Sequence, residues 1–168
     1  MGRIIAVTNQ KGGVGKTTSC INLAAALALT RRRVLLVDLD PQGNATMGSG
    51  VDKHEVEYSG CDVLLGEVNI EQAIIASEAA GYDVLPGNSD LTAAEVELLQ
   101  AENGGQRLRA ALGHVMERYD YILIDCPPSL NMLTINALTA AQGVLIPMQC
   151  EYYALEGLSA LVDTVSQI

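Results

Sequence analysis

Basic residues are scarce in this sequence. Its 168 residues include 10 lysines and arginines against 20 aspartates and glutamates, for a formal charge of −10 at pH 7. After Lys53 the only basic residues are Arg107, Arg109 and Arg118, beside 17 acidic ones, so residues 54–168 have a formal charge of −14. Binding to duplex DNA depends on clustered lysines and arginines that neutralise phosphates. We therefore expect these residues alone to form no DNA-binding surface.

The sequence also lacks long apolar runs and paired cysteines. A membrane-spanning helix needs roughly 18 or more uninterrupted apolar residues, and polar residues interrupt even the richest stretch, INLAAALAL. The four cysteines, at positions 20, 61, 126 and 150, form no CxxC pair, and the chain opens on a strand-like segment instead of a signal peptide. These features predict a soluble cytoplasmic protein with reduced thiols.

Strand and helix patterns alternate along the chain. Short runs of apolar residues, many with branched side chains, predict strands at residues 3–8, 33–40, 82–87, 119–128 and 143–149. Helical patterns occupy residues 16–30, 90–100, 106–117, 131–141 and 153–168, with shorter ones at 62–65 and 70–75, and Ser89 or Asp90 as the cap of the helix that ends near Gln100. A polar, glycine-rich loop covers 41–60. The alternation predicts one three-layer α/β domain over residues 1–168, with a mostly parallel sheet flanked by helices.

The segment TNQKGGVGKTTS, residues 8–19, lies between the first strand and the first helix. Its glycines let backbone N–H groups surround an anion at the positive end of a helix. We expect Lys16 to reach the β and γ phosphates of a nucleotide, the Thr17 hydroxyl to bind Mg²⁺, and Thr18 to add a phosphate contact. The rest of the cradle would be formed by Gly12, Gly13, Val14 and Gly15.

The segment departs from the standard P-loop pattern at its start. Gln10 occupies the position of the first glycine, and Lys11 follows it. The string KGGVGKTT resembles the deviant Walker A motif of the ParA and MinD superfamily of ATPases. That resemblance implies that Lys11 reaches across a dimer interface to the phosphates held by the other subunit, where a second cation would stabilise developing charge. The alternative is a solvated Lys11 in an ordinary P-loop.

Two aspartate motifs extend the resemblance. LLVDLDPQGN places Asp38 and Asp40 at the carboxyl end of the second strand, where open α/β sheets bind ligands. It resembles the switch I segment of the ParA family, which implies that Asp40 orients the attacking water and that Asp38 supports Mg²⁺ or its waters. The alternative is an acidic turn. YILIDCPPS resembles Walker B and switch II, with Asp125 holding the metal through water.

The segments IPMQCEYYALEGL, VLPGNSDL and NALTAA resemble the Soj-type chromosome-partition branch more closely than the MinD cell-division branch. The resemblance implies a Mg²⁺-dependent ATPase, weak without its partner, that dimerises on ATP. It further implies non-specific DNA binding through segments beyond Ile168, a ParB-type partner, and a place on the bacterial nucleoid in chromosome or plasmid segregation. Lys11, Lys16 and Asp40 would be the catalytic residues.

Two other functions remain open at this point. One is a membrane-recruited division regulator that resembles MinD, although no amphipathic membrane helix is visible in the sequence and we expect no membrane partner. The other is a remnant with the fold but without activity. The sequence ends at Ile168 inside a helical pattern, so we expect the natural protein to continue and this P-loop domain to lack its C-terminal portion.

Overall fold

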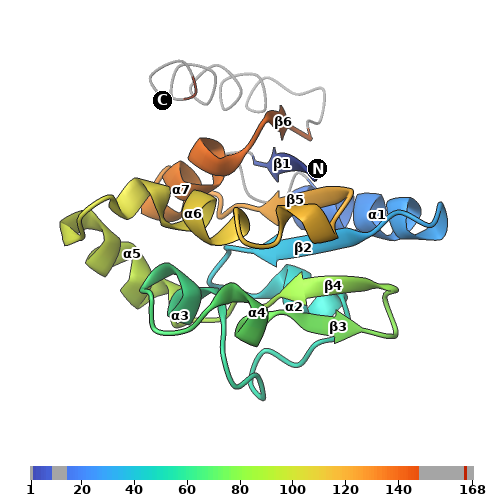
Figure 1. Cartoon of the computed structure of the whole chain (residues 1–168), viewed down its shortest axis with the longest axis horizontal. Helices are drawn as coiled ribbons and strands as arrows, with labels where there is room; N and C mark the ends of the chain where they lie inside the picture. The colour runs from blue at the N-terminus through green and yellow to red at the C-terminus, as the bar shows by residue number, and fades with distance from the viewer. Residues whose placement is uncertain (1, 9–14, 148–164, 166–168) are drawn as a thin grey trace.

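The computed structural model describes residues 2–8, 15–147 and 165. Within them lies a sheet of six strands in the order β3-β4-β2-β5-β1-β6 (Figure 1). The strands are β1 (Arg3–Val7), β2 (Val34–Asp38), β3 (Ile75–Ser77), β4 (Tyr82–Leu85), β5 (Tyr121–Asp125) and β6 (Gly143–Leu145). Every neighbouring pair is parallel except β3 with β4. The mostly parallel sheet confirms the predicted fold class.

Helices cover both faces of this sheet. They are α1 (Lys16–Leu29), α2 (Asn44–Gly48), α3 (Gly60–Leu64), α4 (Ile70–Ala73), α5 (Leu91–Gln100), α6 (Arg107–Leu112) and α7 (Met132–Ala140), with 3-10 turns at Gly104–Gln106 and Met116–Arg118. No helix among the residues placed by the structure is both long and apolar enough to cross a bilayer.

The two faces of the sheet have separate cores because successive strand residues point to opposite sides. In β2, Leu35 and Val37 pack with residues of α5, α6 and α7, whereas Val34 and Leu36 pack with residues of α1 and α2. All four side chains are buried, as expected for a parallel strand covered on both sides. This arrangement gives the three layers predicted from the sequence.

The structure departs from the predictions in several elements. The loop at 41–60 contains α2, and the edge strand β3 was not predicted. The helix expected over 106–117 is wrong in its second half: α6 ends at Leu112, and tighter turns follow that bury Val115 in the core. Asp90 starts α5 without a side-chain hydrogen bond, which differs from the expected cap. The helix expected at 153–168 lies outside the described residues except for Val165.

The turn after α1 contains a strained residue. Arg31 has a positive φ of 63°, in the left-handed region that glycine usually occupies at a helix end. The N–H groups of Arg31 and Arg32 bond to the carbonyls of Ala28 and Leu27, which is the Schellman pattern of bonds. The turn therefore has the geometry of a glycine-terminated helix without the glycine.

Replacing Arg31 with glycine should stabilise the protein. We expect Arg31→Gly to raise the free energy of unfolding by about 0.5–1 kcal/mol, because the relief of left-handed strain exceeds the entropy that glycine adds to the unfolded chain. Urea unfolding measures the change. Arg31→Ala, which removes the charge but keeps the Cβ, should give no comparable gain, and equal gains in both variants would contradict the backbone explanation.

Candidate active site

Two aspartates end neighbouring strands on the same rung of the sheet. The pairing register places Asp125 of β5 beside Asp38 of β2 on one side and beside Val7 of β1 on the other. Both carboxyl groups are fully buried. The carboxyl ends of β1, β2 and β5 thus lie at one edge of the sheet, where the loops that follow parallel strands form ligand sites. The predicted glycine loop follows β1 directly in the sequence, so it begins at this edge.

Lys16, the first residue of α1, lies against the carboxylate of Asp125. The preceding Gly15 has a left-handed conformation with φ 77°, which a side chain would disfavour. Lys16 Nζ donates a 2.6 Å hydrogen bond to Asp125 Oδ1, and Thr17 Oγ1 donates to Asp125 Oδ2 at 3.0 Å. The first two residues of α1 therefore occupy both oxygens of the buried carboxylate.

Burial and charge act against each other in this ion pair. Burial lowers the pKa of Lys16, but the adjacent Asp125 carboxylate and the nearby Asp40 together outweigh burial, and the pKa is raised overall. Burial raises the pKa of Asp125, and the ammonium of Lys16 opposes that rise. Lys16 is therefore a fixed positive charge at neutral pH. A cation at the positive end of a helix is the arrangement that a phosphate group requires.

Asp40 is turned toward the same ammonium. Its Oδ2 lies 3.7 Å from Lys16 Nζ, and its Oδ1 accepts a 3.0 Å hydrogen bond from the N–H of Gln42. Only 6% of Asp40 is exposed. The carboxylate is thus held in one orientation at the site, with one oxygen engaged by its own loop and the other facing Lys16.

Asp38 has a different set of contacts. Its Oδ2 accepts from the N–H and the hydroxyl of Thr46 at 2.9 and 2.6 Å, and its Oδ1 accepts from the N–H of Asp40 at 3.1 Å. Burial raises the pKa of Asp38 to about 7, although the bonds from Thr46 and Asp40 act to lower it. These contacts give Asp38 a structural task in the loop after β2. Its predicted support of Mg²⁺ stays a prediction.

The donor set fits a magnesium ion bound together with phosphates. Among the described residues, two carboxyl groups, from Asp40 and Asp125, face the ammonium of Lys16, so the site has an excess of negative groups that a divalent cation would balance. Across residues 2–8, 15–147 and 165, no three His, Cys, Asp or Glu side chains form a cluster able to hold a metal by themselves. Mg²⁺ commonly takes only one or two protein carboxylates beside water and substrate phosphate.

The structure brings together five of the predicted site residues at one edge of the sheet: Lys16, Thr17, Asp38, Asp40 and Asp125. Gly15 precedes them as the N-cap of α1, and Thr18 is exposed. Four other residues of the predicted phosphate cradle lie outside the described residues, namely Lys11, Gly12, Gly13 and Val14.

Sequence reasoning missed Thr46 and Gly87. The Thr46 hydroxyl accepts a 2.9 Å hydrogen bond from the N–H of Gly87, which lies in the loop after β4. The segment VLPGNSDL was noted in the sequence, but only as part of a family pattern. No local signal connects a threonine in the loop after β2 with a glycine 41 residues later.

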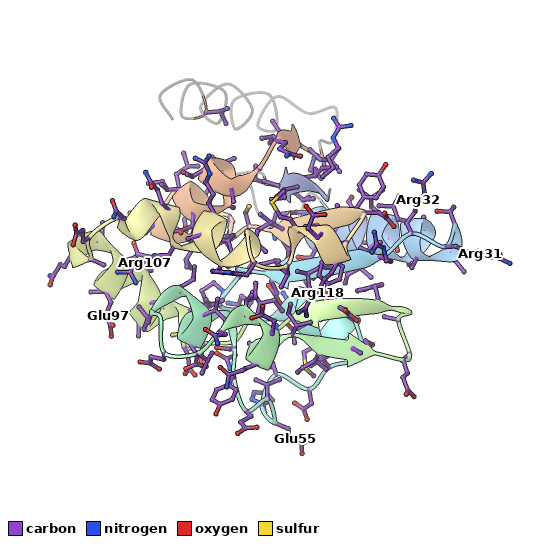
Figure 2. The ribbon with its side chains drawn as sticks, in the orientation of Figure 1. Arg31, Arg32, Glu55, Glu97, Arg107 and Arg118 are labelled. Carbon is purple, nitrogen blue, oxygen red and sulfur yellow. The ribbon has the colours of Figure 1, made fainter. Side chains whose placement is uncertain are left out.

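A cavity away from this site lies at the opposite end of the strands. Its volume is about 560 Å³, and residues at the starts of β2 and β4 line it together with Tyr119, which precedes β5, and with Arg32, Arg33 and Arg118. In Figure 2, Arg31 and Arg32 extend from the far end of α1, and Arg118 lies near β4. Arg33 pairs with Asp120 at 3.2 Å, and both side chains are partly exposed. None of the site residues described above lines this cavity.

Comparisons with known proteins identify relatives of this chain. A family model described as an AAA domain matches residues 2–168. The chain is 66% identical over 168 residues to an uncharacterised protein of Pseudomonas putida, 56% over 165 residues to the sporulation initiation inhibitor protein Soj of Bacillus subtilis, and 54% over 168 residues to the chromosome partitioning protein ParA of Myxococcus xanthus. Alignments cover 100%, 98% and 100% of this chain, which spans 64%, 65% and 59% of those relatives.

Solved structures give the same result for the fold. The structure of cobyrinic acid a,c-diamide synthase from Mycobacterium smegmatis with ADP and magnesium has a TM-score of 0.95 and 45% identity, and the match covers 99% of this chain and 68% of that one. A putative plasmid partition protein of Borrelia burgdorferi bound to AMPPNP has a TM-score of 0.89 and 32% identity, covering 99% and 69%.

Proposed function

We propose that this chain, which belongs to the AAA-domain family and has Soj and ParA proteins among its relatives, binds MgATP and hydrolyses it in a DNA-partition system. The observation that carries the proposal is the junction of Lys16, Thr17 and Asp125 at the carboxyl edge of the sheet. Two of these residues come from the start of α1 and the third from the end of β5. That is the arrangement expected of a P-loop and a Walker B carboxylate.

Each residue has a defined task in this proposal. Lys16 exchanges its contact with Asp125 for the β and γ phosphates of ATP, and the N-terminus of α1 adds its positive dipole. Thr17 and Asp125 are the residues that would hold Mg²⁺, the latter through water. When bound, Mg²⁺ neutralises charge on the phosphate oxygens. Asp40 orients the attacking water and accepts its proton.

Dimerisation, a partner protein and DNA binding belong to the same proposal. Lys11 would reach the phosphates of a second subunit, so hydrolysis would require an ATP-dependent homodimer and stay slow until a ParB-type partner acts. Non-specific DNA binding would lie in segments that the longer relatives possess beyond the region matched here. The acidic balance of residues 54–168 supports that location, since these residues would repel phosphates.

The name of one structural neighbour suggests a different activity, cobyrinic acid amidation. Identity to that protein is 45%, against 56% and 54% to Soj and ParA, which supports partition over amide synthesis. No described feature of the site favours an amidation substrate. We therefore retain the partition function as the proposal.

Lys16→Ala should weaken ATP binding in the presence of Mg²⁺ by about 10- to 100-fold, because charge-assisted contacts to phosphate contribute about 1.5–3 kcal/mol. Isothermal titration measures the affinity. Lys53→Ala is the matched control, since Lys53 binds the carbonyl of Gln42 and contacts no group of the ion pair. Equal affinity for the wild type and Lys16→Ala would refute the assignment of the loop.

A further inference from the structure

Three segments meet at one buried side chain, Thr46. Its N–H and hydroxyl both donate to Asp38 Oδ2, at 2.9 and 2.6 Å, and the same hydroxyl accepts from the N–H of Gly87 at 2.9 Å. Thr46 and Asp38 are completely buried. Both the donor and an acceptor lone pair of the hydroxyl are therefore used, inside the protein, to join β2, α2 and the loop after β4.

This junction closes the loop that carries Asp40. The carboxylate of Asp38 accepts from Asp40 N–H at one end of the loop and from Thr46 at the other. Between these anchors, Asp40 Oδ1 is held by the N–H of Gln42. A shift of Thr46 would therefore be transmitted through one carboxylate to the backbone of Asp40, whose side chain faces Lys16.

The junction has little room to adjust. A Cβ added at Gly87 would lie 2.4 Å from the backbone oxygen of Asp38 and 3.1 Å from its Cγ, so the loop after β4 packs directly on the end of β2. A Cβ at Gly43 would lie 2.6 Å from the carbonyl oxygen of Gly87. The loop after β2 is thus pressed against the loop after β4, with the Thr46 hydroxyl between them.

We propose that Thr46 is a positioning residue for ATP hydrolysis, which acts through Asp38 to hold Asp40 in place for its water. The inference rests on the proposed function, in which Asp40 orients that water. In the proposed function, Lys16 and Thr17 bind phosphate from a different element, α1, and their side chains hydrogen-bond to Asp125 instead of Thr46. Loss of the hydroxyl therefore affects the catalytic step and leaves nucleotide binding intact.

The test compares Thr46→Val, which keeps the shape but loses the hydroxyl, with Thr46→Ser, which keeps the hydroxyl. In Thr46→Val we expect kcat for ATP hydrolysis to fall by about 10- to 100-fold with KM nearly unchanged, because a small displacement of a catalytic group strongly lowers the rate of the chemical step. Thr46→Ser should restore most of kcat. Thr46→Ala also lacks the hydroxyl and should lower kcat in the same way, so it replaces Thr46→Val if that variant does not fold.

Two controls distinguish a positioning role of Thr46 from a general loss of packing around α2. Ser49→Ala removes another buried hydroxyl, at the end of α2, which bonds to Tyr82 Oη at 2.6 Å instead of Asp38. It should keep kcat. In the Asp40→Asn background, Thr46→Val should give no further fall in kcat, since both changes act on the same group.

The outcomes are distinct. A normal kcat in folded Thr46→Val, or an equal loss in Ser49→Ala, overturns the positioning role while the proposed ATPase function stands. An additional loss from Thr46→Val in the Asp40→Asn background also overturns it, because Thr46 would then act independently of Asp40. Absence of ATP turnover in the wild-type protein together with its partner overturns the proposed function and this inference together.

Discussion

Asp40→Asn should lower the kcat for ATP hydrolysis by about 100-fold or more, within the range that a positioned general base contributes. The substitution keeps the size of the side chain and an oxygen for the N–H of Gln42, but it removes the negative charge that faces Lys16 at 3.7 Å. Lys16 keeps its 2.6 Å partner Asp125, so the ammonium stays in place. ATP affinity should therefore change little.

Phosphate release and ATP titration, measured on the same preparations, separate these two effects. Asp52→Asn is a suitable control, because Asp52 is exposed and its carboxylate bonds only to the nearby N–H of His54 among the contacts found. Its kcat should match that of the wild type. Wild-type turnover in Asp40→Asn would remove Asp40 from the mechanism.

Asp125→Asn should make ATP binding largely independent of Mg²⁺. In the structure, Asp125 engages Lys16 and Thr17, which are the groups that phosphate and Mg²⁺ would use. ATP without metal must displace this buried carboxylate and then lie near its negative charge. Neutralising Asp125 should therefore raise metal-free ATP affinity by about tenfold, since charge-assisted bonds contribute about 1.5–3 kcal/mol.

The same variant should lose most of the gain in affinity and turnover that Mg²⁺ gives to the wild type. Isothermal titrations with ATP, in EDTA and in Mg²⁺, measure both effects. Asp38→Asn is the matched control: it lies on the same buried rung but bonds to Thr46, so metal-free ATP affinity should stay at the wild-type value. If Asp125→Asn instead binds metal-free ATP more weakly, the ion pair with Lys16 does not compete with phosphate.

These two predictions assign different tasks to two acidic groups that lie close together around Lys16. In these predictions, Asp125 would govern whether phosphate and metal enter the site, and Asp40 would govern the hydrolysis step after they are bound. The third carboxyl group, Asp38, holds the loop between them through Thr46. The distinction follows from contacts and not from residue type, because all three are buried aspartates at or just after a strand end.

Local sequence patterns were sufficient to identify most elements that build the site. Apolar runs marked β1, β2, β4 and β5, and the glycine loop followed by an alanine-rich helix marked the start of α1. These signals are local because the apolar pattern of a strand or a helix can be recognised within a few consecutive residues. The sequence did not indicate α2, which lies in a polar, glycine-rich stretch, or β3, which begins at the last residue of a predicted helical pattern.

Spacing and family resemblance by themselves identify the candidate site residues, which are Lys16, Thr17, Asp38, Asp40 and Asp125. Only the tertiary structure decided how they are paired. β5 inserts between β1 and β2, which brings Asp125 next to Asp38 and within 2.6 Å of Lys16, 109 residues earlier in the chain. Strand order depends on packing summed over both faces of the sheet, and such long-range contacts leave no local trace in the sequence.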